Sequence, residues 1–263
     1  EFKEFCGKCA PAAHPLLPPL PPTPPPRPPP PPPLPCSSWS GLPEEPAPMK
    51  CGVFWFLHIG KTGGSSVNVH LKSMAGAHGW DFVELYNGQR GFDYRGYWNM
   101  TPAFQKIAEG VQNRWRPVKA IVSQHHTSPG FGMYIKDHLL VPWRARLEAK
   151  GCALVSSTVL RAQPAQLISN VYYNSVTRDK LPRFANYHAN YHARYLLYGG
   201  YEWPQYLKAQ VDGFDADLEL RLLEPARATL AAFDVVGRTH ELDLYFETIN
   251  QVLGWPTGAR PIW

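Results

Sequence analysis

The sequence predicts an α/β domain in which helices cover both faces of a mostly parallel central sheet. Three apolar segments of strand length carry this prediction, at residues 53–57, 118–122 and 153–160. The first and third each lead through a short turn into a segment of helical character. Continuous apolar runs of this kind are typical of strands buried on both faces, so helices must cover the sheet on both sides.

The first apolar run stops at a loop with three glycines, one lysine and three hydroxyl side chains, and helical character resumes at residues 67–74. Glycines let the backbone approach a ligand and point successive N–H groups at one spot. The helix start adds partial positive charge, worth ~0.3–1 kcal/mol toward an anion. We therefore expect a phosphate or sulfate site here. Its candidate residues are Lys61, Thr62, Gly63, Gly64, Ser65 and Ser66.

The second run is followed directly by Ser123, Gln124, His125 and His126. Polar side chains beyond the carboxyl end of a strand occupy the place where open α/β sheets bind ligands. An imidazole, with an unperturbed pKa near ~6.5, can act as a general base near neutral pH. Either His125 or His126 is therefore a candidate catalytic base.

The third run ends in Arg161, and a helix opened by Pro164 follows. The eight-residue gap from Arg161 to Ser169 lets a guanidinium at the strand end and a hydroxyl two turns into the helix converge on one group. A bidentate contact between arginine and phosphate is geometrically specific. The spacing therefore makes these two residues candidates for contacting the same group of a ligand.

The remaining segments are less specific. Residues 80–98 are dense in aromatic side chains and include Arg90 and Arg95, a composition that suits a sugar-binding surface. Helices are expected at residues 102–113 and 215–232, a short strand at 233–236, and a closing amphipathic helix at 241–253.

The first 50 residues are expected to form a disordered, proline-rich stem, and residues 51–263 the folded domain. The proline run favours an extended polyproline II rod. The sequence has neither a membrane span nor a signal-peptide pattern. Cys51 and Cys152 lie beside apolar runs and are expected in or near the core. Asn99 is a candidate N-glycosylation acceptor.

Composition and spacing argue against several classes of site. The formal charge of +5 suits an anionic ligand but is too small to indicate nucleic-acid binding. Cys6 and Cys9 lack the second pair that a zinc site needs. His188 and His192 would share a helix face, but no glutamate follows His188 and no third ligand is evident. We therefore expect no metal.

The loop resembles a known signature. Residues 58–66 read His-Ile-Gly-Lys-Thr-Gly-Gly-Ser-Ser. They are similar to the His-Ile-Pro-Lys-Thr-Gly-Gly-Ser/Thr-Ser signature of Golgi membrane-anchored carbohydrate sulfotransferases, such as those acting on heparan sulfate 2-O or galactose 3-O positions. Gly60 replaces the usual proline. The segment from Arg161 to Ser169 is similar to the family's Arg-Asp-Pro-x-x-Arg-x-x-Ser, with Ala162 and Gln166 as departures and the proline one place late.

The resemblance implies a single, P-loop-like catalytic domain after the stem, and 3′-phosphoadenosine-5′-phosphosulfate (PAPS) as the sulfuryl donor without a metal. The loop with Lys61 would hold the 5′-phosphosulfate, Arg161 and Ser169 the 3′-phosphate, and His125 or His126 would be the base. Arg194 lies in a segment similar to the family's Asn-x-x-x-Arg-x-Leu, so it would reach cofactor or substrate. The acceptor would be a glycan at the luminal side of the Golgi membrane, reached through an anchor that this sequence does not include.

Two other functions remain open at this stage. The first is a nucleotide kinase or NTPase, although a P-loop needs a glycine five positions before the Gly-Lys pair, and Trp55 occupies that position. The second is a non-catalytic glycan-binding or interaction protein on the same scaffold. The sequence does not indicate the acceptor sugar or the oligomeric state.

Overall fold

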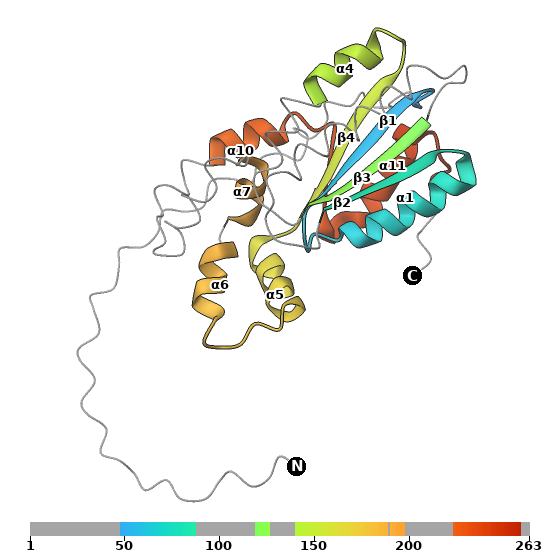
Figure 1. The fold of residues 1–263 in the computed structure, drawn as a ribbon. Helices are drawn as coiled ribbons and strands as arrows, with labels where there is room; N and C mark the ends of the chain where they lie inside the picture. The colour runs from blue at the N-terminus through green and yellow to red at the C-terminus, as the bar shows by residue number, and fades with distance from the viewer. Residues whose placement is uncertain (1–47, 88–118, 127–139, 189, 198–222, 259–263) are drawn as a thin grey trace, which may run out of the picture. The chain divides into compact units, whose positions relative to one another are not determined.

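The computed structural model describes residues 48–87, 119–126, 140–188, 190–197 and 223–258 (Figure 1). Within these ranges a five-stranded sheet has the order β2-β3-β1-β4-β5, and every neighbouring pair is parallel. Its strands are β1 (Gly52–His58), β2 (Asp81–Asn87), β3 (Lys119–His126), β4 (Ala153–Leu160) and β5 (Val235–Arg238). The predicted α/β class with a parallel sheet is therefore confirmed.

Eight helical segments accompany the strands in the described ranges, and none is long and apolar enough to cross a membrane. The longer ones are α1 (Gly64–His78), α5 (Gln163–Tyr173) and α11 (Leu242–Leu253). The shorter ones are α4 (Val141–Glu148), α6 (Leu181–His188), α7 (Tyr191–Leu197), α10 (Leu223–Leu230) and the 3₁₀ turn η3 (Thr239–Glu241).

The central strand β1 is fully buried, and its side chains alternate between two hydrophobic clusters. Val53, Trp55 and Leu57 pack with residues of α4 and α7 on one face of the sheet. Phe54 and Phe56 pack with residues of α1 and α11 on the other face (Figure 1). Burial on both faces explains why β1 reads as an unbroken apolar run.

The strand order reverses at β1, which is flanked by β3 on one side and β4 on the other. In open α/β sheets, ligands bind outside the carboxyl ends of the strands at such a switch point. The loop after β1 and the turn after β4 both emerge at this edge, and α5 and α6 lie beyond it in Figure 1. The fold therefore brings the predicted anion-binding segments to one edge of the sheet.

Several local expectations are corrected by the structure. His125 and His126 are the last residues of β3 and do not follow it, because β3 extends to pair with both β1 and β2. Strand β2 and helix α4 were not predicted from the sequence. His188 and His192 do not share one helix, because the chain turns at Asn190 (φ 45°) between α6 and α7. The predicted stem lies outside the described residues as far as residue 47, and so does the helix at 102–113. The domain begins slightly earlier than predicted, because Met49 is buried and its amide donates to the Val252 carbonyl.

A disulfide joins Cys51 to Cys152, two residues that the sequence analysis placed in or near the core without pairing them. Each immediately precedes the start of a strand, β1 and β4, and these two strands pair in parallel from Gly52 and Ala153 onward. The bond therefore closes a large loop, since its two cysteines are 101 residues apart in sequence.

Replacing both cysteines by serine should lower the free energy of unfolding by ~2–5 kcal/mol, because a long loop is no longer closed in the unfolded chain. The anion-binding loop lies at the other end of β1, ~20 Å away for a seven-residue strand, so its geometry should persist. Urea unfolding of the oxidised wild type and the double variant measures the effect. An unchanged midpoint would mean that the bond contributes no stability.

Candidate functional site

Hydrogen bonds to its carbonyl groups hold the loop between β1 and α1 in place. Five consecutive carbonyls, from Ile59 to Gly63, each accept a hydrogen bond. The donors are, in order, Thr62 Oγ1 (2.9 Å), Gln166 Nε2 (3.2 Å), Arg161 Nη1 (3.3 Å), Thr239 Oγ1 (2.6 Å) and the Ser66 amide (3.0 Å). Three of these donors, Gln166, Arg161 and Thr239, belong to distant parts of the chain, so the surrounding protein restrains the loop.

The backbone of this loop has the conformation of an anion nest. Lys61 has φ 63° and Gly63 has φ 92°, both in the left-handed region. Alternation of this kind turns neighbouring N–H groups toward one point. No side chain caps the start of α1 at Gly63, and the first N–H groups of a helix lack carbonyl partners within it. Backbone N–H groups of the loop and of the helix start therefore lie where the sequence predicts an anion.

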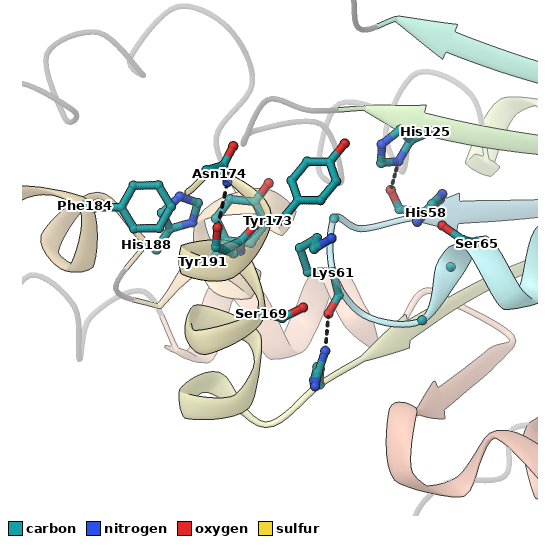
Figure 2. A pocket seen from close by; sticks show the side chains of 15 residues that line it. His58, Lys61, Ser65, His125, Ser169, Tyr173, Asn174, Phe184, His188 and Tyr191 are labelled. Atoms are coloured by element: carbon teal, nitrogen blue, oxygen red, sulfur yellow. Dashed lines mark hydrogen bonds between the residues drawn. The ribbon is translucent and has the colours of Figure 1, made fainter. Parts of the chain in front are cut away.

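A cavity of about 660 Å³ lies over this loop (Figure 2). Its described lining comes from the ends of β1, β3 and β4, the start of α1, and from α5, α6 and α7. The lining residues are His58, Gly60, Lys61, Gly63, Gly64, Ser65, His125, Arg161, Ser169, Asn170, Tyr173, Asn174, Phe184, His188 and Tyr191. In Figure 2, Lys61 and Tyr173 lie between the two histidines at one end and the Phe184–His188 cluster at the other.

Most of the predicted anion-binding residues meet at this cavity: Lys61, Gly63, Gly64, Ser65, Arg161 and Ser169. Thr62 and Ser66 are not brought to it. The Thr62 side chain is fully buried and its hydroxyl donates to the Ile59 carbonyl, so it braces the loop from within. The Ser66 amide bonds to the Gly63 carbonyl in the first turn of α1.

Lys61 is the cation at the centre of the cavity. Its ammonium lies 3.6 Å from the centre of the Tyr173 ring, a cation–π contact. Partial burial, and secondly the nearby Arg161 guanidinium, lower the pKa of Lys61 from its ordinary value. Two cations that repel each other at one site favour the binding of an anion, because the anion relieves their repulsion.

The two histidines form a close, tilted pair at one end of the cavity. The rings of His58 and His125 have centroids 4.0 Å apart. His125 Nδ1 lies 3.2 Å from the His58 carbonyl oxygen. Because a carbonyl only accepts, Nδ1 carries the proton, and Nε2 is then the basic nitrogen of neutral His125.

Burial keeps both imidazoles neutral. The pKa of His58 falls to about 3, first through burial and then through repulsion by His125 and Lys61. Burial also lowers the pKa of His125, although its bond to His58 and the charge of Glu84 oppose this. His125 is therefore an uncharged proton acceptor at neutral pH. The side chain of His126 lies outside the described part of the structure, which leaves the choice between the two histidines to experiment.

Gly64 is required by its contact with His58. A Cβ atom built on Gly64 would overlap the His58 imidazole, whereas a Cβ on Gly76, in the same helix, meets nothing within 4 Å. Gly64→Ala should therefore destabilise the fold by ~1–3 kcal/mol through overpacking. Gly76→Ala, the matched control, should be neutral or stabilising by up to ~1 kcal/mol. Urea unfolding compares the two, and equal effects would rule out a tight contact at Gly64.

The far end of the cavity is aromatic and was not identified from the sequence. The Phe184 and His188 rings are 4.2 Å apart, and those of His188 and Tyr191 are 5.2 Å apart. Tyr173 could have been found from sequence, because it lies one helical turn after Ser169. Phe184 and His188 also lie one helical turn apart, on α6, but the contact between His188 and Tyr191 depends on the turn between α6 and α7.

Three predicted substrate residues are not placed by the structure. Arg90 and Arg95 lie outside the described residues. Arg194 belongs to α7, and its side chain also lies outside them. Across the described ranges, no three His, Cys, Asp or Glu side chains come together in an arrangement that could hold a metal ion.

No protein-family model matches the sequence, and no curated protein matches it either. Among solved structures, the chain is similar to an uncharacterized protein from Eubacterium ventriosum ATCC 27560, with 9% sequence identity and a TM-score of 0.34. That match covers 77% of this chain and 97% of the other chain. Likeness at this level carries no argument about function, which must come from the site.

Proposed function

We propose that this protein transfers a sulfuryl group from PAPS to a hydroxyl group of a carbohydrate. One observation carries the proposal. The Lys61 loop and the Arg161–Ser169 pair, which lie far apart in sequence, line the same cavity together with His125. Two cationic clusters and one neutral base match a donor with two anionic ends and an acceptor that must lose a proton.

In the proposed reaction, Nε2 of His125 takes the proton of the acceptor hydroxyl. The hydroxyl oxygen forms a bond to sulfur as the bond from sulfur to the bridging oxygen breaks. The ammonium of Lys61 and the amides of the loop stabilise the charge that grows on the bridging oxygen, as in phosphoryl transfer. The products are a sulfate ester and adenosine 3′,5′-bisphosphate.

Arg161 would do two things at once. One of its nitrogens bonds to the Lys61 carbonyl, and the guanidinium has further donors for a phosphate. Arg161 would therefore hold the 3′-phosphate together with Ser169 while it also fixes the loop around Lys61. Fixed donors of this kind let the reaction proceed without a metal.

The cellular setting is part of the proposal. A P-loop-like catalytic domain, a glycan acceptor and a luminal Golgi location rest on the sequence resemblance. The Cys51–Cys152 disulfide supports a lumen, because disulfides persist mainly in oxidising compartments.

Transfer of radiolabelled sulfate from PAPS to a panel of glycans tests the function, and calorimetry with adenosine 3′,5′-bisphosphate tests the binding site. We expect binding of the bisphosphate without added metal and labelling of at least one glycan. Absence of bisphosphate binding, together with magnesium-dependent ATP binding, would contradict the proposal and favour a kinase or NTPase. Bisphosphate binding without labelling of any acceptor would favour a non-catalytic protein.

A further inference from the structure

Two glutamines of α5 connect the anion-binding loop to the opposite wall of the cavity. Gln166 Nε2 donates to the Gly60 carbonyl (3.2 Å), and Gln166 Oε1 accepts from Gln163 Nε2 (3.4 Å). Gln163 Nε2 also donates to the His188 carbonyl at the end of α6 (2.6 Å). This glutamine relay thus runs from Gly60 through Gln166 and Gln163 to His188.

The direction of the relay is fixed. Both of its ends are backbone carbonyls, which only accept, so each glutamine must turn its NH₂ group toward a carbonyl. Gln166 is fully buried, with 0% of its surface exposed, so water does not compete for its bonds. A buried amide with defined partners at both its atoms is a rigid connector.

The relay lies between two groups of predicted anion-binding residues. One is the loop with Lys61, here called the Lys61 cluster, and the other is the Arg161–Ser169 cluster. Gly60 directly precedes Lys61, and Gln166 lies one helical turn before Ser169 on α5. The bond between Gln166 and Gly60 therefore sets how far the loop is from the helix that carries Ser169. Gly60 and Gln166 are also two of the positions at which the chain departs from the sulfotransferase signatures, and they contact each other.

We propose that Gln166 is a positioning residue that sets the span between the Lys61 cluster and the Arg161–Ser169 cluster, and so favours ligands with two anionic groups over ligands with one. This inference rests on the proposed function. A ligand with one anionic group uses one cluster, so its affinity depends little on the span. A ligand with two anionic groups must contact both clusters at once. If the distance between the clusters is already set, binding loses less free energy to the ordering of the site.

The affinity test uses Gln166→Met, which keeps the length of the side chain and removes its hydrogen bonds. Calorimetry measures adenosine 3′,5′-bisphosphate against adenosine 3′-monophosphate and 5′-monophosphate. We expect the variant to bind the bisphosphate about tenfold more weakly and each monophosphate less than about threefold more weakly. Gln251→Met, at an exposed position of α11, should change none of these affinities. Equal losses for all three nucleotides would overturn the inference, because a general loss of structure would affect them alike.

Hydrogen exchange provides a test that needs no ligand. In Gln166→Met, the amides of residues 60–65 should exchange faster, while the amides of β1 remain as protected as in the wild type. Unchanged exchange in the loop would overturn the inference whether or not any nucleotide binds. If the wild type binds no bisphosphate but the loop of the variant exchanges faster, the proposed function fails, and the role of the relay in holding the loop stands.

Discussion

Lys61→Ala should lower kcat for sulfate transfer by at least ~10²–10³, the cost of removing one group that stabilises charge in the transition state. The Lys61 ammonium contacts the Tyr173 ring and is repelled by Arg161, and among the described residues no carboxylate pairs with it. The fold should therefore tolerate its loss. Alanine retains the Cβ atom, so the left-handed backbone at this position is under the same strain as before.

Lys72→Ala is the matched control, because Lys72 is an exposed lysine of the neighbouring helix α1. It should leave both turnover and thermal stability unchanged. Circular dichroism melts of both variants test whether the fold is intact. Retained turnover in Lys61→Ala, measured with saturating donor and acceptor, would exclude a role for this ammonium in the chemical step.

His125→Ala should slow the chemical step by ~10²–10⁴, the usual contribution of a general base. The pH profile gives a second signature. Burial lowers the pKa of His125 below its ordinary value of 6.5, so the neutral, basic form prevails above that lowered pKa. The wild-type rate should rise with pH through a midpoint below 6.5 and then level off near neutral pH.

The alanine variant should lack this rise in rate. His78→Ala, at the exposed end of α1, should keep both the rate and the pH profile of the wild type. Single-turnover rates measured between pH 4.5 and 8 make the comparison. A wild-type rate in His125→Ala, with a large loss in His126→Ala, would assign the base to His126.

The sequence predicted the parts of the site that depend on local pattern. Glycine, lysine and hydroxyl residues at fixed spacing after an apolar strand indicate an anion-binding loop, because strand, turn and helix start are neighbours in the chain. The structure places Lys61, Arg161 and Ser169 around one cavity. The strand order places the loop after β1 and the turn after β4 at the same edge of the sheet. This could be predicted from the sequence only by assuming that the sheet is parallel.

Most of what the sequence did not reveal depends on contacts between distant segments. Thr62 was expected to face the ligand, but its hydroxyl bonds within the loop. Gln166 replaces the second arginine of the signature that the segment resembles, yet its side chain donates to the Gly60 carbonyl, 106 residues away in sequence. His58 begins the segment that resembles the sulfotransferase signature, but its ring contact with His125 depends on the pairing of β1 with β3. The partners of Gln166 and His58 lie on other segments, so spacing along one segment cannot reveal them.

The Cys51–Cys152 disulfide, at the start of β1 and β4, also favours the native register between these two strands. A slip of one residue between these strands moves them ~3.3 Å and turns every side chain to the opposite face. The Cβ atoms of Cys51 and Cys152 would then point to opposite faces, and cysteines whose Cβ vectors point apart cannot be bridged without backbone movement. During oxidative folding the covalent link would therefore select the alignment in which Lys61 and Arg161 emerge side by side.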